Sequence, residues 1–181
     1  YELLEAREQS LFARLGVFVN GCTLEAAQAV VGQEATLSCA SLVDKSLLRR
    51  EDGDGETRFT MLETIREYAL ERLEARDEGE AMRRRHATFF LELALVAEPE
   101  LQGLHQTMHL EHLEREHNNL RAALQWSVEQ GAAEVETGLR LGGALRLFWF
   151  KCNHRSEGSK WLEAALAVAP GGESLMPARA S

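Results

Sequence analysis

Cysteine, long apolar runs and a phosphate-binding loop are scarce or missing in this sequence, and each absence excludes a class of protein. The three cysteines, Cys22, Cys39 and Cys152, form no CxxC pair, which argues against a disulfide framework or a thiolate zinc site and favours a reducing cytosol. No apolar run approaches the roughly 18 residues that a membrane-crossing helix needs, so no membrane partner is expected. The pattern GxxxxGK followed by Ser or Thr is also absent, so we predict no ATP site and no catalysis within these residues.

Positive charge is scarce as well. The formal net charge is −9. Residues 1–62 contain 6 basic and 10 acidic side chains, and residues 63–181 contain 14 basic and 19 acidic side chains. A free-standing nucleic-acid binder usually carries a basic surface, because phosphate neutralisation supplies much of its affinity. Neither half is therefore a hidden basic module. The sequence begins at Tyr1 rather than at methionine, and we expect a fragment of a longer cytoplasmic protein.

Residues 1–62 show the order of elements that is typical of a winged-helix domain. Apolar stripes at helical spacing, glycine stop signals and an N-capping Thr23 predict three helices, at residues 2–15, 23–31 and 35–43. Two short segments, 46–50 and 58–61, flank the acidic, glycine-rich stretch EDGDGE, which suits a hairpin loop. Three helices followed by a small β-hairpin correspond to a helix-turn-helix core and its wing.

The stretch Arg58–Leu73 predicts a strand that runs directly into a helix. Phe59 and Met61 alternate with polar residues, and from Leu62 onward the apolar spacing becomes helical. Such a strand and helix would form a stiff joint, which we expect to couple the first domain to the helices that follow. The residues assigned to this coupling are Met61, Leu62, Ile65, Arg66 and Tyr68.

The rest of the sequence is predicted to be helical, so that the whole is mainly α. Residues 63–100 would form connecting helices. Residues 101–181 would form a helical region of the tetratricopeptide type, which we expect to continue beyond this fragment. Helices are expected at residues 80–97, 106–130, 134–150 and 156–169, before a frayed tail at 171–181. In the last pair, small and large residues precede a proline, as in tetratricopeptide hairpins: Leu145, Trp149, Gly158, Leu162, Ala165 and Pro170. An ordinary helical hairpin is the alternative.

Several blocks of the sequence resemble one family. They are LFARLGVFVNGCTLEAAQAV (11–30), SLVDKSLL (41–48), RFTMLETIREYALERL (58–73), EHNNLRAAL (116–124) and WLEAAL (161–166). Together, and in this order, they resemble the bacterial signal-transduction ATPases with numerous domains (the STAND class), many of which are large transcriptional regulators of the LuxR or SARP type.

The resemblance implies an architecture for the parent protein. In such regulators a nucleotide-binding ATPase core precedes a winged helix, which precedes a helical sensor array, and DNA binding belongs to another domain. This chain would be the winged helix and the start of the sensor, with ATP bound elsewhere in the parent. The resemblance therefore implies a non-catalytic segment for regulation and protein interaction, which couples the sensor to the ATPase core.

DNA binding by the winged helix is an alternative function. The predicted third helix carries only Lys45, at its end and beside Asp44. The predicted wing tip is acidic, with Glu51, Asp52, Asp54 and Glu56, and the basic group nearby consists of Arg49, Arg50 and Arg58. We therefore expect contact with protein, either the regulator's own ATPase domain, other subunits or a signalling protein, rather than with DNA.

Metal binding is a second alternative. Four residues share one face of a predicted helix at offsets of 4, 3 and 4: His105, His109, His112 and Glu116. Glu114 and His117 add an ExxH pair, a spacing that can contribute to metal sites. Because all of these candidates come from one helix, we interpret them as a solvated polar face and predict no resident metal.

The run Arg83, Arg84 and Arg85 is the densest basic segment. It suits an exposed helix turn whose charge offsets nearby glutamates. The functional interpretation is an interaction patch for an acidic protein surface, or for nucleotide phosphate in the intact parent protein.

Overall fold

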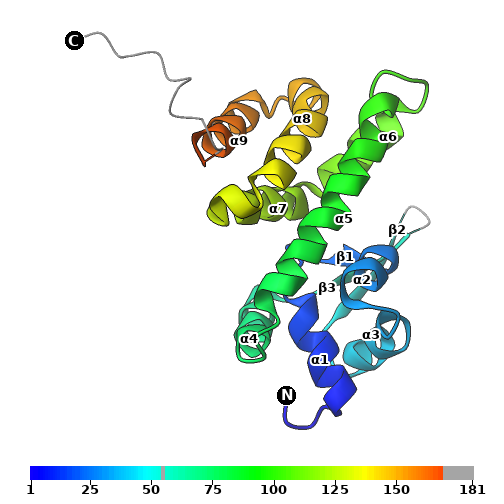
Figure 1. Ribbon diagram of the computed structural model, residues 1–181. Helices are drawn as coiled ribbons and strands as arrows, with labels where there is room; N and C mark the ends of the chain where they lie inside the picture. Colours follow the sequence, from blue (N-terminus) through cyan, green and yellow to red (C-terminus); the bar gives the residue numbers. More distant parts are fainter. Residues whose placement is uncertain (54–55, 169–181) are drawn as a thin grey trace. The chain divides into compact units, whose positions relative to one another are not determined.

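The computed structural model describes residues 1–53 and 56–168 (Figure 1). The chain divides into two compact units between Phe89 and Phe90. The predicted loop residue Asp54, Pro170 and the tail 171–181 lie outside the described residues. The first unit contains α1 (Ala6–Leu15), β1 (Cys22–Thr23), α2 (Leu24–Val31), α3 (Ala35–Asp44), β2 (Arg49–Gly53), β3 (Glu56–Thr60) and α4 (Glu63–Glu74). Helix α5 (Gly79–Glu100) is followed by α6 (Gln106–Arg115), α7 (His117–Glu129), the 3-10 turn η1 (Gly131–Ala133), α8 (Val135–Lys151) and α9 (Arg155–Val168).

The first unit is built on three helices that contact one another, α1, α2 and α3. Their inward positions are fully buried and apolar, and include Leu11, Phe12, Val30 and Leu42. Thr23 caps α2 as predicted, since its hydroxyl accepts a hydrogen bond from the backbone N–H of Ala26 at 3.1 Å. The three-helix core predicted from the sequence is confirmed.

The sheet has three strands rather than the two predicted, in the order β1-β3-β2, and all pairs are antiparallel. Phe59 at its centre lies opposite Cys22 on one side and Arg50 on the other. Asn20 and Gly21 have φ angles of 64° and 84°, and this turn brings Cys22 and Thr23 beside β3. A two-residue strand shows no alternation of apolar and polar residues, which is why the pattern missed it.

Helix α4 packs against α1, so the first compact unit extends beyond residue 62, where the predicted winged-helix domain ends. Ala69 and Leu73 are completely buried on the face that meets α1. Leu62, from which the sequence predicted helical spacing, is 49% exposed. It occupies the N-cap position with an extended backbone (φ −60°, ψ 142°), so it does not share the helical stripe.

The second unit contains α6 to α9, and the single helix predicted at 106–130 is in fact two helices. The break lies at Glu116, whose carboxylate is buried and accepts a hydrogen bond from the side-chain amide of Asn119 at 2.7 Å. Its backbone angles of φ −93° and ψ 5° leave the α-helical range, and α7 begins at the next residue. The single-helix prediction is therefore wrong.

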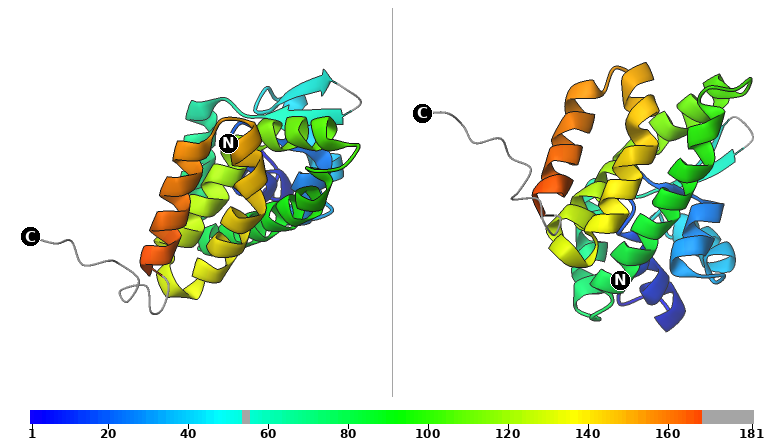
Figure 2. Two further views of the ribbon diagram at one scale, coloured as in Figure 1. Left: turned by 90° about the horizontal axis from the view of Figure 1, so that it is seen from above. Right: turned by 45° about the horizontal axis from the view of Figure 1, so that its top comes forward.

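Helices α7, α8 and α9 lie side by side (Figure 2). Gly158 of α9 faces the indole of Trp149 on α8 so closely that a Cβ at this position would lie 2.4 Å from Cε3. This close approach between a small and a large residue is the packing that the sequence predicted for this hairpin. No helix among the described residues is both long enough and apolar enough to cross a bilayer.

Candidate functional site

Helix α3 is the second helix of the helix-turn-helix, and three residues separate it from α2. The helix itself contains no lysine or arginine. Its exposed side chains are Thr36, Leu37, Ala40 and Asp44, and Leu37 is 83% exposed. The outer face of α3 therefore offers apolar and acidic groups rather than a cluster of cations.

Lys45, the basic residue at the end of α3, is exposed but forms an ion pair with a buried carboxylate of the same domain. Its ammonium group lies 2.5 Å from the carboxylate of Glu8 on α1, and the hydroxyl of Ser41 donates to the same oxygen at 2.5 Å. Glu8 is 7% exposed. The hydrogen bonds from Lys45, Ser41 and the backbone of Glu5 hold the pKa of Glu8 at about 2. This network fixes α3 on α1 and engages the charge of Lys45.

The wing carries charges of both signs on its exposed strands. Arg49 and Arg50 are exposed on β2, and the guanidinium of Arg50 lies 3.0 Å from the carboxylate of Asp52. Thr57 donates a hydrogen bond to that carboxylate at 2.7 Å. The hydrogen bond from Thr57 makes the largest contribution to lowering the pKa of Asp52, and the contact with Arg50 lowers it further. The wing is therefore a surface of mixed charge.

Arg58 on β3 is directed toward the backbone instead of the solvent. Its guanidinium donates to the carbonyl oxygens of Asn20 at 3.2 Å and Gly21 at 3.0 Å. Arg58 thus stabilises the turn that leads into β1, in addition to its place at the centre of the sheet.

Two of the residues predicted to couple domains, Arg66 and Tyr68, connect α4 with residues in and around α1. Arg66 donates to the carbonyl of Gly16 at 3.2 Å and forms an ion pair with Glu63 at 2.6 Å. The Tyr68 ring makes an edge contact with Tyr1, with centroids 5.6 Å apart. Met61 and Ile65 are half-buried in the same region. These side chains attach the segment after the wing to the first helix of the unit.

The basic run on α5 is largely engaged by neighbouring acids. Arg83 lies 2.5 Å from the carboxylate of Glu74, and Arg84 lies 2.8 Å from that of Glu80 one turn earlier. This arrangement agrees with an exposed helix turn whose charges are offset locally.

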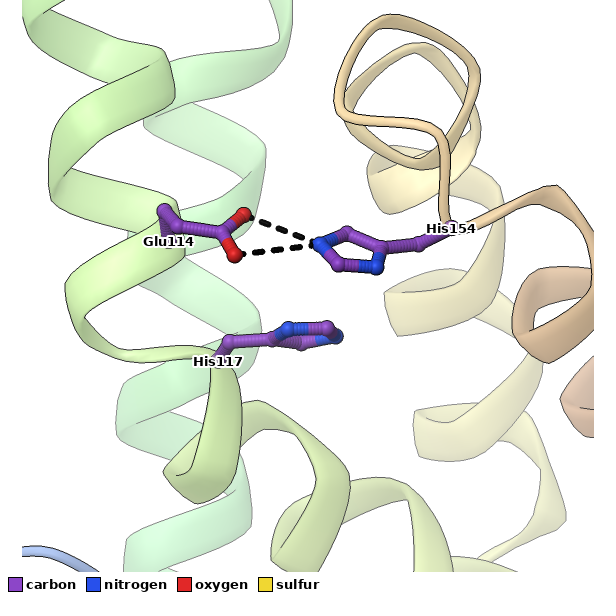
Figure 3. Close-up of side chains that lie close together, drawn as sticks. All are labelled: Glu114, His117 and His154. Atoms are coloured by element: carbon purple, nitrogen blue, oxygen red, sulfur yellow. Dashed lines mark hydrogen bonds and ion pairs between the residues drawn. The ribbon is translucent and has the colours of Figure 1, made fainter.

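The histidine face predicted on one helix is not assembled as a ligand set. His105 precedes α6 and is exposed, whereas Glu116 is buried and hydrogen-bonded to Asn119. Among the described residues, the histidine and acidic side chains close enough to share one metal ion are instead Glu114, His117 and His154 (Figure 3). The ExxH spacing indicated the first two, but no signal in the sequence connects them with His154, which lies in the loop between α8 and α9.

Comparison with known proteins identifies the first unit. The winged helix-turn-helix domain family matches residues 4–74, a range that includes α4. Together with the three-helix core and the sheet, this match decides the assignment. Residues 4–74 form a winged helix-turn-helix domain. The domain's α3 occupies the position of the recognition helix in this fold.

The similarity to curated proteins extends beyond the winged-helix domain. The chain is 38% identical over 177 residues to "Putative HTH-type transcriptional regulator Rv0890c" of Mycobacterium tuberculosis, a match that covers 92% of this chain and 19% of that protein. "Putative HTH-type transcriptional regulator Mb0914c" of Mycobacterium bovis matches equally, and "Uncharacterized protein Rv0894" of M. tuberculosis is 34% identical over 93 residues. The chain thus spans about a fifth of the length of the first relatives. No solved structure matches it significantly.

Proposed function

We propose that this chain is the winged-helix and adjoining helical segment of a transcriptional regulator. The observation that carries the proposal is the winged-helix domain at residues 4–74, within a chain that resembles HTH-type regulators over most of its length. A cytoplasmic location and the absence of catalysis in this segment remain predictions from the sequence.

Direct DNA contact is the first candidate for the action of the winged helix, and the comparisons favour it over the domain-coupling function predicted from the sequence. The domain family and the names of the relatives both point to a helix-turn-helix. Phosphates would be met by Arg49 and Arg50 on the wing, and base edges by α3, with Thr36 among its exposed polar side chains.

Duplex binding by the whole chain tests this candidate. Two phosphate contacts predict a slope of about −2 in the logarithm of affinity against the logarithm of salt concentration, hence a roughly tenfold loss between 50 and 200 mM salt. Fluorescence anisotropy with a labelled duplex measures this dependence. The double variant R49E/R50E should remove it, whereas the control R140E, an exposed arginine of α8, should retain the slope. Equal duplex affinity of both variants, or no binding at low salt, would exclude DNA contact through the wing.

Protein contact is the second candidate, and the surface of α3 favours it. Leu37 is 83% exposed in the first turn of the helix, and Lys45 is bound by Glu8. An exposed leucine on a helix whose one charged residue is the acidic Asp44 suits a protein surface better than phosphate. The variant L37D should leave the unfolding curve unchanged and abolish the function of the intact regulator without altering its duplex affinity. Retention of full function by L37D would exclude this candidate.

We further propose, from the resemblance to the STAND class, that the parent protein carries an ATPase core whose state the winged helix transmits to a tetratricopeptide-like array. The contacts of Arg66 with Gly16 and of Tyr68 with Tyr1 support a role for the segment after the wing in this coupling. The variant R66A in the full-length regulator should uncouple effector response from nucleotide hydrolysis, measured as steady-state ATPase activity with and without effector. A full-length chain that does not bind ATP would refute the coupling hypothesis while leaving the winged-helix assignment intact.

A further inference from the structure

We infer that Glu114, His117 and His154 form a binding site for a divalent transition-metal ion, with Zn²⁺ as the best-fitting probe. The three side chains come from three places in the second unit. Glu114 lies in the last turn of α6, His117 is the first residue of α7, and His154 lies in the loop between α8 and α9. Figure 3 shows the side chains of Glu114 and His117 on one side and His154 on the other, close to one another.

The distances suit a shared ion. One potential ligand atom from each residue lies within 4.8 Å of the other two, and the His154 Nε2 is 3.0 Å and 3.1 Å from the two carboxylate oxygens of Glu114. Two ligands on a tetrahedral Zn²⁺, at about 2.1 Å from the ion, are roughly 3.4 Å apart. Small side-chain rotations therefore bring all three atoms onto one ion, and a water molecule would complete the coordination.

His117 provides an independent indication that the group is built for a ligand. Its side chain is 9% exposed, and its Nε2 is a buried polar atom without a hydrogen-bond partner among the described residues. Glu157 approaches this nitrogen to 3.2 Å, but without hydrogen-bonding geometry. A buried imidazole nitrogen without a hydrogen bond is costly, and coordination of a cation would satisfy it.

The surrounding charges also suit a cation. Arg121 donates two hydrogen bonds to the carboxylate of Glu157. This contact is the main reason that the pKa of Glu157 is held at about 2. Arg121 and Glu157 thus neutralise each other, and the Glu114 carboxylate remains to balance the charge of the ion. Two imidazole nitrogens and one carboxylate favour Zn²⁺, Co²⁺ or Ni²⁺ over Mg²⁺ or Ca²⁺.

Cys152 lies at the edge of the same group. Burial, the charge of Glu114 and a hydrogen bond to that carboxylate raise the pKa of its thiol. The group of potential ligand atoms within 4.8 Å of one another does not include its thiol, so Cys152 is not assigned as a ligand.

The test uses the whole chain, treated with a chelator and then titrated with Zn²⁺ by calorimetry. We expect one equivalent to bind, and expect H154Q and E114Q each to weaken binding at least tenfold. Changing a residue that only hydrogen-bonds a metal ligand typically weakens metal binding by about 10- to 100-fold, and loss of a ligand itself should weaken binding at least as much. The control H105Q, at an exposed histidine outside the group, should bind Zn²⁺ like the original chain.

Co²⁺ provides the second measurement. Its visible absorption bands should show nitrogen and oxygen coordination in the original chain and in H105Q, and should be absent in H154Q. Circular dichroism confirms that the variants remain folded. Equal Zn²⁺ affinity in H154Q, E114Q and H105Q, or no binding by the original chain, would reduce the group to a hydrogen-bonded contact and overturn the inference.

Discussion

Replacement of Gly158 by alanine should destabilise the second unit although alanine is the better helix former. A Cβ at residue 158 would lie 2.4 Å from Cε3 and 2.6 Å from Cδ2 of Trp149. Trp149 is 3% exposed, so its ring cannot turn into solvent to make room. The clash involves the fused ring atoms themselves, and the backbone of α8 or α9 would have to move.

The magnitude follows from two opposing effects. Overpacking of a well-packed core costs about 1–3 kcal/mol. The change from glycine to alanine in a helix interior contributes about 1 kcal/mol in the stabilising direction. Because this clash involves a buried indole, we expect the upper part of the first range and a net loss of about 1–2 kcal/mol.

Gly143 on α8 is the matched control. It is also a helical glycine, but nothing lies within 4 Å of the position that its Cβ would occupy, and the residue is exposed. G143A should therefore gain the helix-propensity term without the clash, a stabilisation of about 0.5–1 kcal/mol. Each variant adds one methyl group to a helical glycine, and the two should change the free energy of unfolding in opposite directions.

Urea unfolding followed by tryptophan fluorescence measures both effects in the relevant unit. All three tryptophans, Trp126, Trp149 and Trp161, lie after residue 90, so the signal reports on the second unit alone. The midpoint should fall in G158A and rise in G143A. If both variants were stabilised by similar amounts, Gly158 would be an ordinary helix position and the close packing of α9 on α8 would be refuted.

Three further predictions concern the winged-helix domain, which contains no tryptophan and is followed by far-UV circular dichroism in urea. T23A should cost about 1 kcal/mol through loss of the α2 cap, whereas the exposed T36A should stay within about 0.5 kcal/mol of the original chain. L42A should cost about 2–5 kcal/mol because Leu42 is fully buried, whereas L37A on the same helix should change stability by less than about 0.5 kcal/mol. The pKa of Glu8 is about 2 in the folded protein, below its ordinary 4.5, so its stabilising contribution is complete above pH 4.5 and is lost as pH falls toward 2. E8Q should therefore lose less stability than the original chain between pH 5 and pH 3, and an identical loss in both would contradict this assignment.

Much of the fold could be predicted because its signals are local. Helical periodicity, the Thr23 cap and the glycine stop signals placed α2 and α3 within one residue of their observed ends. The hairpin followed from two short segments around a glycine-rich loop. These features depend on neighbours a few residues apart, and their physical causes are present in any short window of the chain.

The parts that could not be predicted depend on tertiary contacts. The break at Glu116 has no glycine or proline to announce it, and the residue's side chain is held in the interior by Asn119. Strand β1 exists because β3, more than 30 residues later, provides its partner. The group at Glu114 and His117 is completed by His154, which lies 37 residues beyond His117 in the sequence. One sequence shows which residue types are present, but such distant approaches are set by how the helices pack.

The charges of the winged helix determine which residues would meet the phosphates in the proposed DNA contact. Lys45 cannot turn to a phosphate without leaving the Glu8 carboxylate, a group that is 7% exposed, without its cationic partner. Arg50 is different, because its ion pair with Asp52 lies in solvent, with the two side chains 56% and 62% exposed. Exposed pairs contribute little, so Arg50 can exchange Asp52 for a phosphate at small cost. The wing, rather than the end of α3, would therefore supply the electrostatic part of binding. On this argument K45Q should perturb the stability of the domain and leave the salt dependence of duplex affinity unchanged, whereas R50E should do the reverse.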